Sequence, residues 1–113
     1  SGEALVELGR RGSSLVVTVD CGAMAHDALA QAHEAGIDVI VVDHHKCATE
    51  LPRAVALVNP NRLDECHEGA AHGHLAAVGV AFLLGVALVR TLRGRGYFAT
   101  RREPELMALL DPV

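Results

Sequence analysis

Short apolar runs alternate with a helical pattern in the first half of the chain. Residues 15–19 (Leu-Val-Val-Thr-Val) and 39–42 (Val-Ile-Val-Val) are continuous and β-branched, which is typical of strands buried on both faces. Residues 24–35, between them, are rich in alanine at helical spacing, and Gly36 is a natural C-terminal stop. Strand, helix and strand within about 30 residues predict a βαβ unit with parallel strands.

The remaining pattern adds four elements and a loop. Residues 3–10 have helical spacing, residues 55–58 form a third short apolar run, and residues 62–74 are polar and read as a loop. Residues 75–92 predict a helix that is apolar nearly all round, which we expect to be buried on most sides. Residues 105–110 look like the start of another helix. The predicted fold is α/β, a parallel sheet with βαβ units followed by a buried helix.

Each of the two apolar strands ends in a carboxylate. Asp20 follows the first strand, and Asp43 follows the second together with His44 and His45. Neighbouring parallel strands lie about 4.8 Å apart, so their carboxyl ends project into one crevice, where open α/β sheets bind ligands. Carboxylates favour Mg²⁺ or Mn²⁺, and an added imidazole favours Mn²⁺. A capping or turn aspartate and a surface histidine pair are the alternative interpretations of the separate residues.

Composition excludes several classes of protein. The 113 residues allow one domain at most, or a piece of one, and the 50% apolar content excludes disorder. With a net charge of −4, 3% aromatic residues and no tryptophan, the chain is neither an obvious free-standing nucleic-acid binder nor a base-stacking platform.

Cysteines and hydropathy bear on the compartment. The three cysteines and the opening Ser-Gly-Glu-Ala lead us to expect a reducing, cytoplasmic location without disulfides. The longest apolar run, residues 75–89, is shorter than the roughly 20 residues of a membrane span, so we expect no membrane association.

Four stretches together resemble a known family. Residues 42–45 (Val-Asp-His-His) match the signature of the DHH phosphoesterase superfamily, and residues 20–22 (Asp-Cys-Gly) match its Asp-x-Gly motif. Residues 51–61, which end in Asn-Pro-Asn, and residues 78–82 (Val-Gly-Val-Ala-Phe) resemble the RecJ-type single-stranded-DNA exonucleases.

The resemblance implies a two-metal phosphodiesterase that degrades single-stranded DNA from its 5′ end with Mn²⁺ or Mg²⁺. By position, Asp20 and His44 correspond to metal ligands. Asp43 and His45 correspond to the remaining signature positions, near the metals or the scissile phosphate, where His45 would contact phosphate or donate a proton to the leaving oxygen. The DNA is the implied partner, and partner proteins are unknown.

Two parts of the family pattern fall outside the chain. The family's Asp-rich first motif would precede residue 1, and the metal aspartate of its fourth motif would follow the Leu-Leu-Asp at 109–111. We therefore expect residues 1–113 to be a partial DHH catalytic domain, cut from a longer protein and inactive by itself.

Three basic side chains are further candidates for substrate binding. His26 lies near the start of the predicted crossover helix, and Arg90 and Arg93 belong to a group of arginines between residues 90 and 102. The alternatives are a helix-surface histidine and a solvated helix end.

A structural zinc site is disfavoured because no Cys-x-x-Cys pair is present.

Two other functions stay open. One is a different phosphodiesterase of the superfamily, acting on oligonucleotides or cyclic dinucleotides, or a manganese pyrophosphatase. The other is a non-catalytic module that keeps the fold and binds a metal or a partner.

Overall fold

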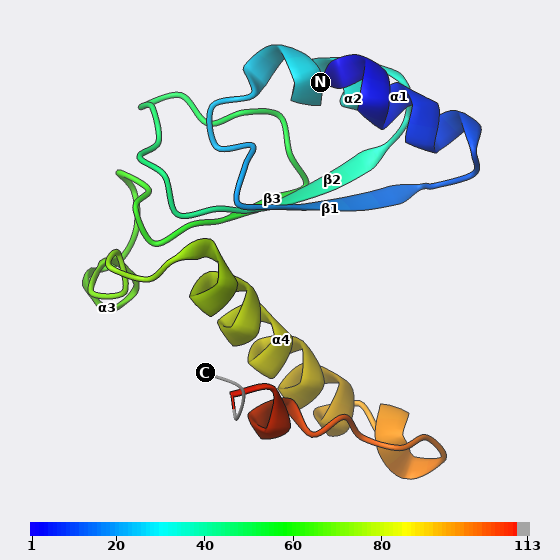
Figure 1. Ribbon diagram of the computed structural model, residues 1–113, viewed down its shortest axis with the longest axis vertical. Helices are drawn as coiled ribbons and strands as arrows, with labels where there is room; N and C mark the ends of the chain where they lie inside the picture. Colours follow the sequence, from blue (N-terminus) through cyan, green and yellow to red (C-terminus); the bar gives the residue numbers. More distant parts are fainter. Residues whose placement is uncertain (111–113) are drawn as a thin grey trace. The chain divides into compact units, whose positions relative to one another are not determined.

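Three parallel strands form the sheet of the computed structural model, which describes residues 1–110. The strands are β1 (Leu15–Val19), β2 (Asp38–Val42) and β3 (Ala56–Val58), in the order β1-β2-β3. Helices α1 (Gly2–Arg10) and α2 (His26–Glu34) lie over the same face of the sheet (Figure 1). The predicted α/β fold and its βαβ unit are confirmed. Asp111, of the Leu-Leu-Asp sequence, lies outside the described residues.

The hydrophobic core of the first unit, residues 1–80, lies between α2 and β2. Leu29 of α2 and Val41 of β2 are almost fully buried, and Ile37 at the junction of the two elements joins them. Burial of such side chains contributes roughly 1.5–3 kcal/mol each. The core thus holds β2 in place, and the segment that follows Val42 starts from this fixed strand.

The strand at residues 15–19 is not buried on both faces, as its sequence predicted. Leu15, Val17 and Val19 are about half exposed, while the residues between them are partly covered. In the described chain β1 pairs with β2 alone, and α1 and α2 lie over one face of the sheet. This β-branched run alternates in exposure because, within residues 1–80, the two helices pack against one face of the sheet.

The second half of the chain consists of helices. They are α3 (His67–Ala70), α4 (Ala77–Gly94) and the 3₁₀ helices η1 (Tyr97–Ala99) and η2 (Leu106–Leu110). The stretch predicted as a loop thus contains the short α3, and the predicted last helix is 3₁₀ rather than α. Among the described residues, those from 81 to 110 belong to a second compact unit.

The prediction that the apolar helix is buried on most sides is wrong for the described chain. Val78, Leu83 and Leu88 of α4 are 77%, 44% and 55% exposed. A helix that is apolar all round needs neighbours on several sides, and η2 is too short to supply them. By length and composition α4 is also apolar enough to cross a membrane, a test that core helices of soluble proteins pass as well.

Gly22 provides a test of the turn that follows β1. Its φ is +117°, and a Cβ there would lie 3.0 Å from Val41 Cγ1 and 3.1 Å from Thr18 Oγ1. We expect Gly22→Ala to lower the free energy of unfolding by about 2–3 kcal/mol, measured by urea unfolding. Gly36→Ala is the matched control, because its φ is +74° with nothing within 4 Å, and we expect a loss of about 1 kcal/mol. Equal losses would show that the close approach at Gly22 is unimportant.

Candidate metal centre at the carboxyl ends of the strands

The carboxyl ends of β1 and β2 bring two aspartates together. The parallel register pairs Val19 with Val42, so the next residues, Asp20 and Asp43, emerge from the same end of the sheet. The backbone N–H of Asp20 donates to the carbonyl of Val42 at 2.9 Å, which continues the ladder by one step. The predicted neighbourhood of the two strand ends is therefore confirmed.

Asp43 is a buried carboxylate with hydrogen bonds to both oxygens. It is 1% exposed. Its Oδ2 accepts from the N–H of Ala23 at 2.9 Å, and its Oδ1 accepts from the N–H of His44 at 2.8 Å and lies 2.6 Å from Nδ1 of His45. Burial alone would raise the pKa of Asp43, but these hydrogen bonds outweigh it and hold the pKa below its usual value. The group is therefore ionised at neutral pH.

Asp20 occupies an unusual backbone conformation. Its φ is +65°, the one positive φ of a non-glycine residue among residues 1–110. Asp tolerates this left-handed region better than most residues, at a cost of about 1–2 kcal/mol. The hydroxyl of Thr18 donates to the carbonyl of Cys21 at 3.0 Å and supports the turn. The Asp20 side chain remains 64% exposed, with Oδ1 3.1 Å from Nε2 of His44.

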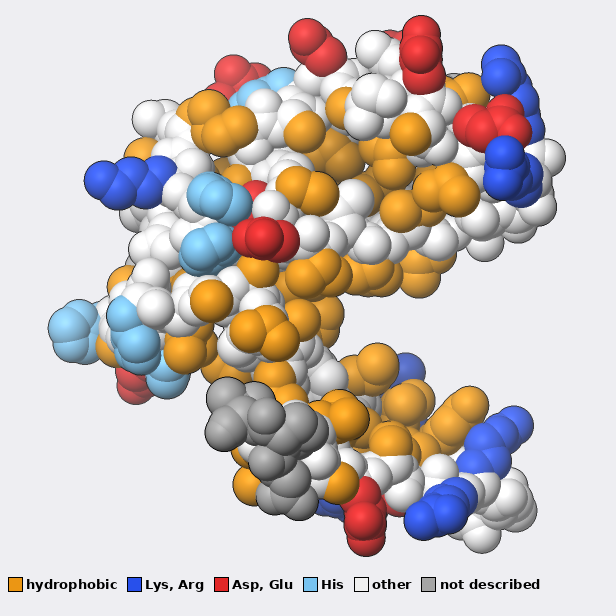
Figure 2. Space-filling view, viewed as in Figure 1, with side chains coloured by type: hydrophobic (Ala, Val, Ile, Leu, Met, Phe, Trp, Pro, Cys, Tyr) orange, Lys and Arg blue, Asp and Glu red, His pale blue; other side chains and the backbone are white. Residues whose placement is uncertain are grey.

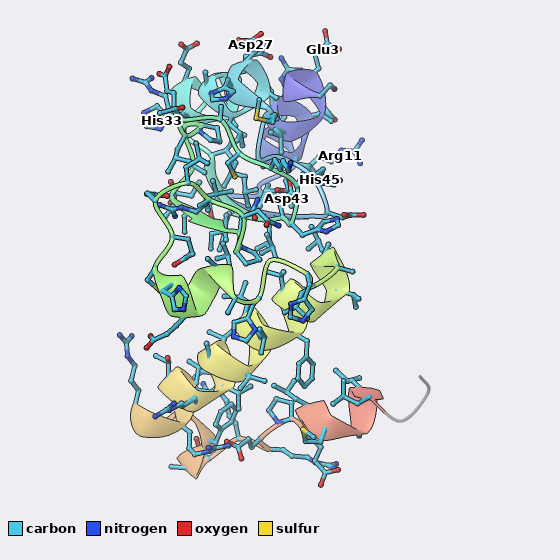
Figure 3. All side chains as sticks on the ribbon, turned by 90° about the vertical axis from the view of Figure 1, so that its left-hand side faces the viewer. Glu3, Arg11, Asp27, His33, Asp43 and His45 are labelled. Atoms are coloured by element: carbon cyan, nitrogen blue, oxygen red, sulfur yellow. The ribbon has the colours of Figure 1, made fainter. Side chains whose placement is uncertain are left out.

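The four predicted site residues form one cluster of possible metal ligands. Asp20, Asp43, His44 and His45 each offer an atom within 4.8 Å of the others. The two imidazole rings lie 4.4 Å apart between centroids, and Figure 3 shows Asp43 and His45 next to each other. Figure 2 shows histidine side chains beside a carboxylate on an open surface.

The donor set fits a divalent cation of the Mn²⁺ or Mg²⁺ kind. Carboxylate oxygens with added imidazole nitrogens suit Mn²⁺ best. Because Nδ1 of His45 faces the ionised Asp43, the proton resides on that nitrogen and Nε2 is left free to act as a base or a ligand. An exposed aspartate, a part-buried imidazole and an oriented second imidazole thus lie within 4.8 Å of one another at one end of the sheet.

The other candidates lie elsewhere. His26 is the first residue of α2, which starts at the same end of the sheet, but it is not one of the four clustered residues. Arg90 and Arg93 are exposed on α4 in the second unit, and Arg93 pairs with Glu103 at 2.6 Å. The roles predicted for these three side chains stay predictions.

The cysteines are free thiols and do not join the cluster. Burial and the nearby charge of Asp43 raise the pKa of Cys47, so its thiol is neutral and unsuited to act as a nucleophile.

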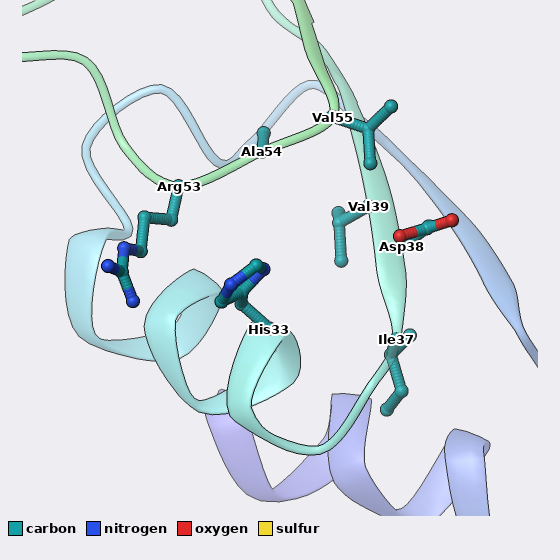
Figure 4. Close-up of a pocket in the computed structure, with 7 residues that line it drawn as sticks. All are labelled: His33, Ile37, Asp38, Val39, Arg53, Ala54 and Val55. Carbon is teal, nitrogen blue, oxygen red and sulfur yellow. The ribbon is translucent and has the colours of Figure 1, made fainter.

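A separate pocket lies at the opposite, amino end of β2, lined by His33, Asp38 and Arg53 among others (Figure 4).

Sequence reasoning missed two residues next to the cluster. Asn59 and Asn61, which follow β3, donate through their amides to the backbone carbonyls of His45 and His44 respectively. Their only signal in the sequence is the Asn-Pro-Asn after the third strand, which we used as part of the family resemblance and not as a source of site residues.

Comparisons with known proteins agree with this geometry. The model of the DHH family, N-terminal domain, matches residues 3–109. Proteins named single-stranded-DNA-specific exonuclease RecJ are 44% identical over 115 residues in Dickeya dadantii and in Escherichia coli, and 40% identical over 92 residues in Bacillus subtilis. These alignments cover 100%, 100% and 80% of this chain, and 19%, 19% and 11% of the relatives. The chain thus spans about a fifth of the first two.

Two solved structures are also similar. Thermus thermophilus RecJ in complex with Mn²⁺ superposes with a TM-score of 0.62 at 35% identity, over 81% of this chain and 13% of that one. An exonuclease RecJ bound to manganese gives 0.61 at 35% identity, over 79% and 22%. With its family match over nearly the whole length and its Asp-x-Gly and Asp-His-His sequences meeting at one end of the sheet, this chain belongs to the DHH family.

Proposed function

We propose that this chain is part of the catalytic domain of a single-stranded-DNA exonuclease, which hydrolyses phosphodiester bonds from the 5′ end with bound Mn²⁺ or Mg²⁺. The observation on which the proposal depends is the cluster of two carboxylates and two imidazoles within 4.8 Å at the carboxyl ends of β1 and β2. Single-stranded DNA is the proposed partner. The free cysteines support a reducing compartment, and the proposed location is the cytoplasm.

The comparisons support this substrate and this metal. The relatives in Dickeya, Escherichia and Bacillus are all named for single-stranded-DNA-specific exonuclease activity, and both similar structures contain manganese. They favour this function over the other phosphodiesterases and the pyrophosphatases of the superfamily. The chain covers 19% of the Dickeya and Escherichia relatives and 11% of the Bacillus one, so the activity is proposed for a protein of their length and not for these 113 residues alone.

Each clustered side chain has a distinct proposed role. Asp20 and His44 hold metal, because the Asp20 carboxylate and Nε2 of His44 face each other at 3.1 Å from two different segments. Bound divalent ions supply Lewis acidity toward phosphate and lower the pKa of water. Asp43 accepts from Nδ1 of His45 and thereby orients that ring. Nε2 of His45 then contacts the phosphate, or in its protonated form donates a proton to the leaving oxygen.

The remaining basic residues have a proposed role in binding DNA. His26 at the start of α2, and Arg90 and Arg93 on α4, supply positive charge or hydrogen-bond donors for the phosphate backbone. Their contribution to affinity is expected to fall as the salt concentration rises.

Substitution of His44 tests the metal site. In the full-length protein we expect His44→Ala to lower turnover of single-stranded DNA by orders of magnitude with little change in folding, because a metal ligand is lost. Turnover with Mn²⁺ and circular dichroism are the measurements. His33→Ala, an exposed histidine at the other end of the sheet, is the matched control and should be nearly silent. Equal effects of the two substitutions would remove His44 from the site.

A second pair of variants separates Asp43 from His45. We expect Asp43→Asn to remain folded with a loss of about 1–3 kcal/mol, since one N–H loses its acceptor, and to weaken Mn²⁺ affinity roughly 10–100-fold. We expect His45→Ala to lower turnover while sparing Mn²⁺ binding, measured by calorimetry. The roles are reversed if His45→Ala abolishes Mn²⁺ binding and Asp43→Asn leaves it unchanged.

The 113-residue chain alone should not degrade single-stranded DNA. A two-metal mechanism would need more ligands than Asp20 and His44 supply, because both carboxylate oxygens of Asp43 already accept hydrogen bonds. Incubation of a labelled oligonucleotide with the purified chain and Mn²⁺ checks this. Robust turnover that His44→Ala abolishes would show that the four clustered residues suffice.

A further inference from the structure

The segment that contains the two site histidines has unusual backbone bonding. The N–H of Asp43 donates to the carbonyl of Val58, and the next backbone N–H to donate to a backbone carbonyl is that of Ala54, which donates to Pro52. None of the described N–H groups of residues 44–53 forms such a bond. Residues 44–53 also belong to no helix or strand. Side chains must therefore fix the peptide groups of His44 and His45, because free backbone at this position would let both rings move.

The Asp43 carboxylate fixes the backbone N–H groups of His44 and His45. Oδ1 of Asp43 accepts from the N–H of His44 at 2.8 Å and from the N–H of His45 at 3.3 Å. This arrangement leaves the carbonyls of the same two residues to be satisfied by other groups.

Asn59 and Asn61 donate hydrogen bonds to the backbone carbonyls of His45 and His44. Nδ2 of Asn59 donates to the carbonyl of His45 at 2.8 Å, and Nδ2 of Asn61 donates to the carbonyl of His44. Oδ1 of Asn59 accepts from the N–H of Asn61 at 2.8 Å, so the two side chains act as one unit. We call these two residues the asparagine clamp.

The clamp is itself held in place. Asn59 is 2% exposed, and its Nδ2 also lies 3.2 Å from Sγ of Cys47. Nδ2 of Asn61 donates a second bond, to the carbonyl of Gly73 at 3.1 Å, and thereby ties the His44 segment to the chain after α3. A Cβ at residue 73 would lie 2.7 Å from Oδ1 of Asn61, so glycine is needed there for Asn61 to keep its place.

We propose that Asn59 and Asn61 are positioning residues of the metal centre, which hold the carbonyls of His45 and His44 so that both imidazoles face Asp20 and the metal. This inference rests on the proposed function. An amide is required because both contacts donate a hydrogen bond to a carbonyl, which a carboxylate cannot do. The partners are 14 and 17 residues away in sequence, so the clamp couples the end of β3 to the end of β2.

The test uses Asn61→Ala in the full-length protein. We expect the dissociation constant for Mn²⁺, measured by calorimetry, to rise roughly 10–100-fold, as for the loss of a partner that orients a metal ligand. The electron paramagnetic resonance spectrum of bound Mn²⁺ should change, and KM for single-stranded DNA should stay within about twofold of its original value. Arg62→Ala is the matched control, because Arg62 donates to the carbonyl of Leu57 at 3.0 Å in the same loop, and its side-chain hydrogen bonds go to Leu57 and Asp64 and to neither histidine.

Two comparisons decide the outcome. Unchanged Mn²⁺ affinity in Asn61→Ala, or an equal loss in Arg62→Ala, would overturn the clamp. Gly73→Ala provides a second variant should Asn61→Ala not fold: it keeps both asparagines but displaces the Asn61 amide, and it should weaken Mn²⁺ binding in the same direction. His44→Ala distinguishes the two proposals, because unchanged Mn²⁺ affinity there contradicts the metal site itself, whereas silence of Asn61→Ala and Gly73→Ala alone contradicts only the clamp.

Discussion

The ionised, buried carboxylate of Asp43 is the interaction on which the rest of the site depends. A buried charge is tolerated only when hydrogen bonds replace its hydration, and Asp43 receives them from the turn after β1 and from its own successors. The N–H of Ala23 can reach it only if the Asp-Cys-Gly turn has its observed shape. The Asp43 carboxylate therefore fixes both the turn after β1, which carries Asp20, and the segment after β2, which carries His45.

Much of the fold was predictable because β2 is encoded by an unbroken apolar run and α2 by its spacing. The larger errors concern burial, and the errors of element type are limited to the short α3 and to η2, which is a 3₁₀ helix. An apolar run such as residues 15–19 reveals that a strand forms, but its exposure depends on what packs against it. Within residues 1–80, β1 has one neighbouring strand, and helices lie over one face of the sheet. The same holds for α4, whose apolar side chains would need more packing partners than residues 81–110 provide, so several of them are exposed.

The four clustered residues were predictable for a simple geometric reason: parallel neighbours end at the same edge, so residues that follow two such strands meet. Asn59 and Asn61 were not, because their bonds to His45 and His44 span 14 and 17 residues and depend on how the β2–β3 connection folds back. Backbone donors such as Ala23 leave no signal in a sequence at all. The groups that hold the cluster in place were thus harder to predict than the cluster itself.

The left-handed backbone at Asp20 has a consequence for attempts to stabilise this protein. Glycine would adopt that φ with less strain, and asparagine is also tolerated there, so a search guided by folding free energy alone would favour replacing the aspartate. Either exchange removes a carboxylate from the cluster. Selection for thermostability and retention of the proposed metal site therefore favour different residues at this one position, and libraries designed for stability should leave it unchanged.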